Sequence, residues 1–289
     1  MSTSATASAE IDEQVTGLGP LNEYPFHLRP MIVAHRGDTS RGAIENSLRA
    51  IAEAMDTGAD MVEIDVQQTA DEVFICYHDE TVLAQDGSAT PVHKLTLREL
   101  VEGSFRDMSG VDFVPTPLLS VLELTRGKIY LNLEIKEYSN RDPKKFVEAL
   151  RVLVDRMNMT LQVLLSSFRI DYIREAPWTL PSCIIQPSEG MLQFFASRAS
   201  LPGSIPTNAA TLKPSELMQA SRATTYACML EELDDQRVRD IKSRNLHVSV
   251  YTITTDDEFR KAVQLGAKAL VCEQPRKFVK LRDSLFHSS

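Results

Sequence analysis

Short apolar runs recur along the chain and alternate with stretches of helical periodicity. Between the runs, apolar residues recur three and four positions apart, as in an amphipathic helix; Phe146, Leu150 and Leu153 are one example. Strands that alternate with helices predict a parallel sheet, and their number favours an α/β fold, a closed (β/α)₈ TIM barrel. The expected strands are 31–34, 61–66, 73–77, 128–136, 162–165, 182–185, 224–230, 247–253 and 269–272.

These nine candidate strands compete for the eight places of the barrel. The segment that starts at Thr224 has the weakest strand pattern, and we expect it to be accessory. The link between 61–66 and 73–77 contains no helical pattern, so the barrel should be irregular between its second and third strands.

Helix boundaries are marked by capping residues. Asn46 or Ser47 can cap a helix that runs to about Thr57. Thr96 and Glu99 form a capping-box pattern ahead of a short helix. The expected helices are 97–102, 117–124, one that starts at Pro143, 234–244, 256–265 and a C-terminal helix.

The composition is that of a globular protein, and 289 residues fit one large α/β barrel or two ordinary domains. Residues 1–25 are rich in Ser, Thr and Ala and are expected to be disordered, which leaves 26–289 as a single TIM-barrel domain. The N-terminus lacks the features of a signal peptide, and no apolar run is long enough to cross a membrane. The four cysteines lack metal or redox spacing and suit a reducing compartment, so we expect a cytoplasmic protein.

The net charge of −9 limits the class of partner. It argues against nucleic acid and against stable association with an anionic membrane, and it favours a small-molecule substrate. The apolar segment Met191–Phe195 could serve as a lid or as a contact in a homo-oligomer, although packing against the barrel is the favoured interpretation.

Titratable residues stand in or just after strands that otherwise look buried. Glu63 and Asp65 are two residues apart on one strand, so their side chains leave the same face. Like charges this close repel each other unless a cation lies between them, and carboxylate oxygens suit one hard divalent ion, Mg²⁺ or Ca²⁺. His35 follows the preceding strand, and His78 follows the next strand after Glu63 and Asp65.

In a TIM barrel these positions lie at one end, where the strands finish and active sites form. Glu134 and Lys136 end the next strand, and Arg36 follows His35. Cationic groups can neutralise the oxygens of a phosphodiester, and two histidines can share the work of general base and general acid. The expected chemistry is therefore phosphodiester hydrolysis.

The sequence resembles the glycerophosphodiester phosphodiesterase family of phospholipase-C-like barrels. The matching segments are His35–Gly37, Glu45–Ser47, Gly58–Val66, His78–Asp79, Leu133–Lys136 and Ser166–Phe168. The resemblance implies that a glycerophosphodiester is cleaved to glycerol 3-phosphate and an alcohol. It also implies a metal bound by Glu63, Asp65 and Glu134, acid–base catalysis by His35 and His78, and phosphate contacts from Arg36 and Lys136. The order of the two histidines, and whether a cyclic phosphate forms first, stay open.

The chain departs from the family pattern where the alcohol or glycerol would be bound. Tyr251 and the segment Cys272–Pro275 replace the usual residues, and Tyr251 is the expected substrate contact in this wall. A sugar phosphodiester of opine type therefore stays an alternative, as does a lysophospholipase D or sphingomyelinase D type of lipid hydrolase. The non-enzyme alternative is a catalytically silent barrel that binds a sugar phosphate. An aldolase or amidohydrolase is disfavoured because the first strand lacks a His-x-His pattern.

Overall fold

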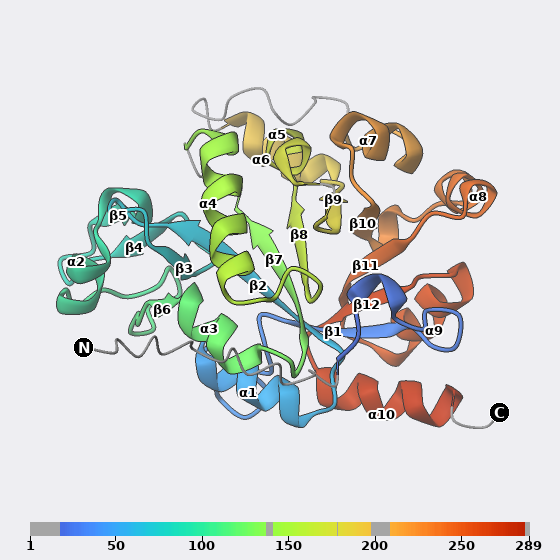
Figure 1. Ribbon diagram of the computed structural model, residues 1–289, viewed down its shortest axis with the longest axis horizontal. Coiled ribbons are helices and arrows are strands. Elements are labelled where there is room, and N and C mark those ends of the chain that lie inside the picture. The colour runs from blue at the N-terminus through green and yellow to red at the C-terminus, as the bar shows by residue number, and fades with distance from the viewer. Residues whose placement is uncertain (1–17, 137–140, 178, 198–208, 287–289) are drawn as a thin grey trace, which may run out of the picture.

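The fold is a closed barrel of eight parallel strands. The computed structural model describes residues 18–136, 141–177, 179–197 and 209–286 (Figure 1). The first strand pairs with both the second and the last strand of the barrel, which closes the sheet and confirms the predicted architecture. The eight strands are β1 (Met31–His35), β2 (Met61–Gln68), β7 (Tyr130–Ile135), β8 (Val163–Ser167), β9 (Ser182–Ile185), β10 (Thr225–Met229), β11 (Val248–Ile253) and β12 (Ala269–Cys272).

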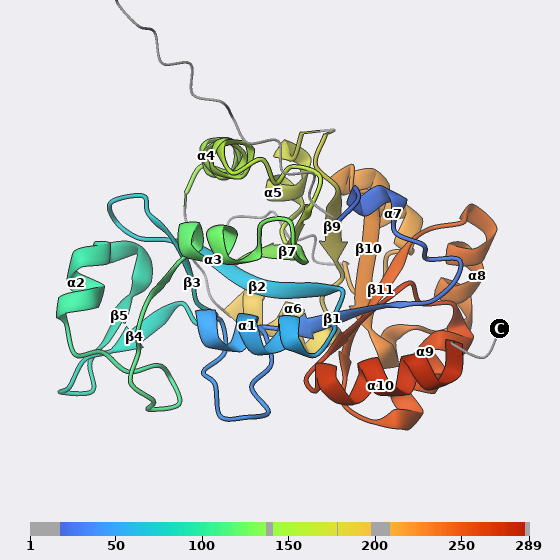
Figure 2. The ribbon, with the colours of Figure 1, turned by 60° about the horizontal axis from the view of Figure 1, so that its bottom comes forward.

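Helices surround this barrel, and several begin where the sequence predicts (Figures 1 and 2). The hydroxyl of Ser47, and not the side chain of Asn46, caps the first helix by accepting from the Ala50 N–H. The expected capping box at Thr96 and Glu99 is present. The helices are α1 (Leu48–Asp56), α2 (Leu97–Glu102), α3 (Leu118–Thr125), α4 (Pro143–Arg156), α5 (Ile170–Glu175), α6 (Glu189–Ser197), α7 (Pro214–Ser221), α8 (Asp235–Arg244), α9 (Asp256–Leu265) and α10 (Pro275–Phe286).

The accessory strand is not the one that the sequence suggested. The segment at Thr224 forms β10, a member of the barrel, so that expectation was wrong. The accessory strand is instead β3 (Phe74–Cys76), which runs antiparallel to β2 and to β6 (Thr116–Pro117). The physical reason is the short link after β2, because a parallel return would need a crossover of a dozen residues or more.

The antiparallel return of β3 has a consequence for the mouth of the barrel. The Tyr77 N–H donates to the Asp65 carbonyl, so the chain comes back beside the middle of β2 and delivers His78 there. The next residues leave the barrel as a lobe at its side (Figures 1 and 2). This lobe contains β4 (Thr81–Leu83), β5 (Ala89–Pro91), η2 (Val92–Lys94) and α2, around a small core that includes Tyr77, Val82 and Leu100.

Regular structure begins within the N-terminal segment, at Leu21. The 3₁₀ helix η1 (Leu21–Glu23) packs at the start of the barrel strands, where Leu21 is buried. The Leu21 N–H donates to the Leu161 carbonyl, and the Tyr130 hydroxyl donates to the Gly19 carbonyl. The remainder of the segment expected to be disordered, residues 1–17, lies outside the described residues.

Alternation along the strands divides the side chains between two environments. On β2, Val62 and Ile64 face outward into the apolar layer beneath the helices. Met61, Glu63 and Asp65 are therefore turned toward the barrel axis. None of the described helices combines the length and the apolar character needed to cross a bilayer.

Candidate active site

Three carboxylates meet at the mouth of the barrel. Glu63 and Asp65 come from β2, and Glu134 lies beside Asp65 on the neighbouring strand β7. One oxygen from each of the three carboxylates lies within 4.8 Å of the others. Glu63 and Asp65 are almost completely buried, at 2% and 1% exposure. The fold thus brings Glu134 on β7 together with the two acids of β2.

The turn after β1 aims backbone and side-chain donors at these acids. Arg36 takes a left-handed conformation with φ of 54°, which costs a non-glycine residue roughly 1–2 kcal/mol. Its N–H donates to Glu63 Oε2 at 3.1 Å, and its Nε lies 3.1 Å from Asp65 Oδ2. Gly37 follows with φ of 98°, and a Cβ there would come within 2.7 Å of the Ala50 backbone. Only glycine fits at this close approach.

The Glu45–Ser47 segment supports the same turn through three separate contacts. Glu45 accepts from Arg36 Nη1 at 3.0 Å. The Asn46 amide donates to Asp65 Oδ2 at 2.8 Å and accepts from the Asp65 N–H at 3.0 Å. Ser47 caps α1. One short segment therefore fixes the arginine, a carboxylate and the helix behind them.

Lys136 lies among the acids. Its Nζ donates to Asp65 Oδ1 at 3.0 Å and to Glu134 Oε1 at 2.9 Å, and the residue is 3% exposed. Burial opposes ionisation of Asp65, but the charges of Lys136 and Arg36 outweigh burial and hold the pKa of this carboxyl well below its usual range.

Glu63 is in the opposite electrostatic situation. Burial, followed by the charges of Asp65 and Glu134, raises its pKa well above the usual value. Its Oε1 atom is buried and has no hydrogen-bond partner among the described residues. A buried carboxylate oxygen without a donor, next to two further carboxylates, fits a hard divalent cation that would supply the missing positive charge.

Both histidines are oriented by a carboxylate on Nδ1. His35 Nδ1 lies 2.6 Å from Glu273 Oε1, and His78 Nδ1 lies 2.8 Å from Asp79 Oδ1. The hydrogen bonds to the histidines keep the pKa of each of these carboxyls below its usual value. With Nδ1 engaged by a carboxylate, Nε2 is the ring atom left for proton transfer. His35 Nε2 lies 3.9 Å from Glu63 Oε2, so it points toward the acids.

Tyr251 presents its ring, and not its hydroxyl, to the barrel interior. The hydroxyl donates to the Gln186 carbonyl at 2.9 Å, and burial raises its pKa well above the usual value. The ring packs edge-on against Phe168, with 6.4 Å between the ring centroids. Tyr251 can therefore contribute an apolar wall next to the acids.

Sequence reasoning missed the two carboxylates that hold the histidines. Asp79 follows His78 directly, so adjacency was the available signal. Glu273 is far from His35 in sequence, but it directly follows β12, which pairs with β1 when the barrel closes. Barrel closure was therefore the signal for Glu273.

The chain matches a family model over most of its length. The model is the Glycerophosphoryl diester phosphodiesterase family, and the match covers residues 35–277. A glycerophosphodiester phosphodiesterase of Caldanaerobacter subterraneus subsp. tengcongensis is 26% identical over 262 residues, which covers 88% of this chain and 98% of the relative. Human lysophospholipase D GDPD1 is 25% identical and covers 89% of this chain and 86% of its own length.

Solved structures share the fold. A putative glycerophosphoryl diester phosphodiesterase from Silicibacter pomeroyi DSS-3 has a TM-score of 0.70 at 20% identity and covers 89% of this chain and 96% of its own. An Oleispira antarctica phosphodiesterase, solved with the product sn-glycerol-3-phosphate, has a TM-score of 0.67 at 22% identity and covers 89% of this chain and 98% of its own. At these identities, the similarity establishes the barrel architecture.

Proposed function

The chain belongs to the glycerophosphoryl diester phosphodiesterase family, and we propose that it hydrolyses a glycerophosphodiester to glycerol 3-phosphate and an alcohol. It is a phosphoric diester hydrolase. The observation that carries the proposal is the cluster of three carboxylates with two histidines at one mouth of the barrel, each histidine held by its own carboxylate.

Glu63, Asp65 and Glu134 would hold one divalent cation, Mg²⁺ or Ca²⁺. All their donor atoms are oxygens, which both ions prefer, and Glu63 Oε1 lacks any other partner among the described residues. When bound, such an ion withdraws electron density from the phosphoryl group and offsets its negative charge.

Arg36 and Lys136 would bind the non-bridging oxygens of the phosphate. Both cations already lie at the acid cluster, and both are largely buried, where a charge–charge contact is stronger than in water. The Asn46 amide and the Glu45 carboxylate keep Asp65 and the Arg36 guanidinium in place for this task.

His35 and His78 would transfer the protons. Nε2 of one histidine takes the proton of the attacking group, which is either water or the neighbouring hydroxyl of the glycerol; in the second case a cyclic phosphate forms, and water then opens it to glycerol 3-phosphate. Nε2 of the other histidine gives a proton to the leaving alkoxide as the phosphorus–oxygen bond breaks. Glu273 and Asp79 bind Nδ1 of each ring, so Nε2 is the atom through which the base accepts and the acid gives a proton, and they stabilise the charged form of each ring.

We also propose that residues 26–289 act as one catalytic domain in a reducing compartment such as the cytoplasm. All four cysteines are free and buried, so no disulfide contributes to this fold.

A substrate panel tests the proposed function. Glycerophosphoethanolamine, glycerophosphocholine, a lysophospholipid and a sugar phosphodiester are each incubated with the protein, and products are followed by ³¹P NMR. We expect glycerol 3-phosphate from the first two substrates, loss of the signal with a chelator, and its return with Mg²⁺ or Ca²⁺. Cleavage of the sugar diester alone, or full activity in the chelator, would refute the proposal.

Glu273 is a positioning residue whose role can be separated from folding. Glu273→Gln should lower kcat about 10- to 100-fold with little change in KM, because the His35 ring loses its anionic partner. Glu273→Asp should restore part of kcat, and Glu102→Gln, which alters an exposed ion pair on α2, serves as the control. Steady-state kinetics and thermal unfolding of the three variants decide this. A fall in kcat that tracks a fall in Tm would show that Glu273 is merely structural.

A further inference from the structure

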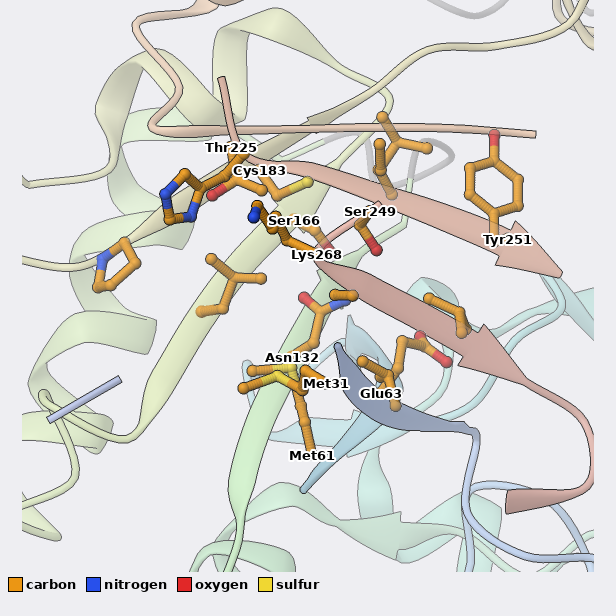
Figure 3. A pocket seen from close by; sticks show the side chains of 18 of the residues that line it. Met31, Met61, Glu63, Asn132, Ser166, Cys183, Thr225, Ser249, Tyr251 and Lys268 are labelled. Atoms are coloured by element: carbon orange, nitrogen blue, oxygen red, sulfur yellow. The ribbon is translucent and has the colours of Figure 1, made fainter. Parts of the chain in front are cut away.

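The interior of the barrel is hollow below the acid cluster. In most barrels of this type, bulky side chains fill the interior in layers. Here five of the residues of β9 to β12 that line the interior have small side chains, and a cavity of about 280 Å³ runs through the barrel (Figure 3). The small inward residues are Cys183, Thr225, Ala227, Ser249 and Ala269.

One end of this hollow opens at the candidate active site. His35, Glu63 and Glu134 line it at that end, and Thr224, His247 and Lys268 line it at the other. His78, Arg36 and Lys136 are not among the lining residues. If one of the two groups esterified to the phosphate enters the hollow, its ester oxygen lies on the His35 side of the phosphate. The ester oxygen of the other group then lies on the His78 side.

The wall of the hollow changes character with depth. Directly beneath the acids, Asn132 pairs with Glu63 and Ser166 pairs with Glu134 across neighbouring strands. Asn132 Oδ1 and Ser166 Oγ are buried and have no hydrogen-bond partner among the described residues, so each can accept from a hydroxyl close to the phosphate. The deeper wall is mostly apolar, with Met31, Val33, Met61, Leu164 and Val271, and its polar members include Thr225 and Ser249.

Two estimates of size agree. The cavity volume is about nine times the volume that one water molecule occupies in the liquid, so the cavity has room for roughly nine non-hydrogen atoms. Tyr251 and His247 mark the two ends along β11, and four residues of strand span about 13 Å. With carbon–carbon bonds of about 1.5 Å in a zigzag, that length takes a chain of roughly ten carbons.

We propose that the hollow binds an uncharged apolar chain of the substrate, so that the enzyme acts on glycerophosphodiesters carrying a chain of about ten carbons. The inference rests on the proposed function and specifies its substrate class. The chain can be attached to the glycerol, as in a lysophospholipid, or can form the alcohol of the diester. Both sources present the same apolar group to the same wall.

A chain-length series tests the proposal. Two sets of glycerophosphodiesters, one with the chain on glycerol and one with the chain as the alcohol, are assayed below their micelle concentrations. In at least one set, kcat/KM should rise about three- to fourfold per added methylene and level off near ten carbons, because each buried methylene adds a constant increment of binding. The set that shows this rise identifies the source of the chain. A flat series in both sets would overturn the proposal.

A variant with a larger side chain in the hollow tests whether the dependence of kcat/KM on chain length arises there. Ala269→Leu should lower the ratio of kcat/KM for the ten-carbon substrate over glycerophosphoethanolamine at least tenfold, because the added side chain occupies the space of the chain. Ser249→Val is the second variant if Ala269→Leu does not fold. Ala89→Leu adds the same bulk to the exposed strand β5 and should leave the ratio unchanged. An unchanged ratio in the filled variants would overturn the proposal.

Failure of the proposed function can be recognised separately. If no diester is hydrolysed, binding of the ten-carbon diester is measured by the shift in Tm of the wild type and of Ala269→Leu. A shift that grows with chain length in the wild type and is lost in the variant would support the binding site even though the reaction was misassigned. Turnover without any chain dependence would refute the binding site alone.

Discussion

Replacing His35 or His78 with alanine is expected to lower kcat about 10²- to 10⁴-fold, the usual contribution of a positioned general acid or base. Each imidazole has Nδ1 on a carboxylate and Nε2 free for the substrate, so the substitution removes the group that is placed to transfer the proton. The double variant should be little worse than the less active single variant, because the two residues act together in the same chemical step.

Metal affinity separates this effect from damage to the site. His35 Nε2 is 3.9 Å from the nearest carboxylate oxygen of Glu63, and neither histidine belongs to the acid cluster. Calorimetric titration of both alanine variants with Mg²⁺ or Ca²⁺ should give affinities close to wild type. If either variant kept most of its turnover, the acid–base assignment would be wrong.

Glu63→Gln should change metal affinity and stability in opposite directions. The amide has one charge fewer, so the affinity for a divalent cation should fall at least tenfold, and activity should fall with it. Without metal, the same change removes a buried charge that repels Asp65 and Glu134, so the free energy of unfolding should rise by about 1 kcal/mol or more.

Urea unfolding with and without metal, together with metal titration, checks both directions. Glu148→Gln, on the exposed face of α4, is the matched control and should change neither quantity. A variant that binds metal as tightly as wild type would remove Glu63 from the site. A variant that is less stable in the metal-free form would show that Glu63 contributes to the fold in its own right.

The sequence predicted the barrel because the strand and helix signals are local. The runs at β9, β12 and α9 have the bounds that the structure shows, since apolar runs and capping residues mark them directly. Membership in the barrel is not local. The segment that starts at Thr224 had the weakest strand pattern, yet it forms β10 between β9 and β11, and the apolar run at Phe74 lies outside the barrel.

The same distinction holds for the site. Glu63 and Asp65 could be predicted to share a face because strand alternation fixes neighbours two residues apart. Glu273 could not be paired with His35 until the last strand was known to lie beside the first. The hollow could not be predicted at all, because it depends on which small side chains on four strands face inward together.

The central claim is that Glu63, Asp65 and Glu134 share one cation at the mouth of the barrel. Anomalous diffraction from crystals soaked in Mn²⁺, which takes oxygen ligands as Mg²⁺ does, tests it most directly. The account predicts one strong peak within coordination distance of all three carboxylates. An active enzyme whose crystals show no peak there, or a peak held by other residues, would contradict it.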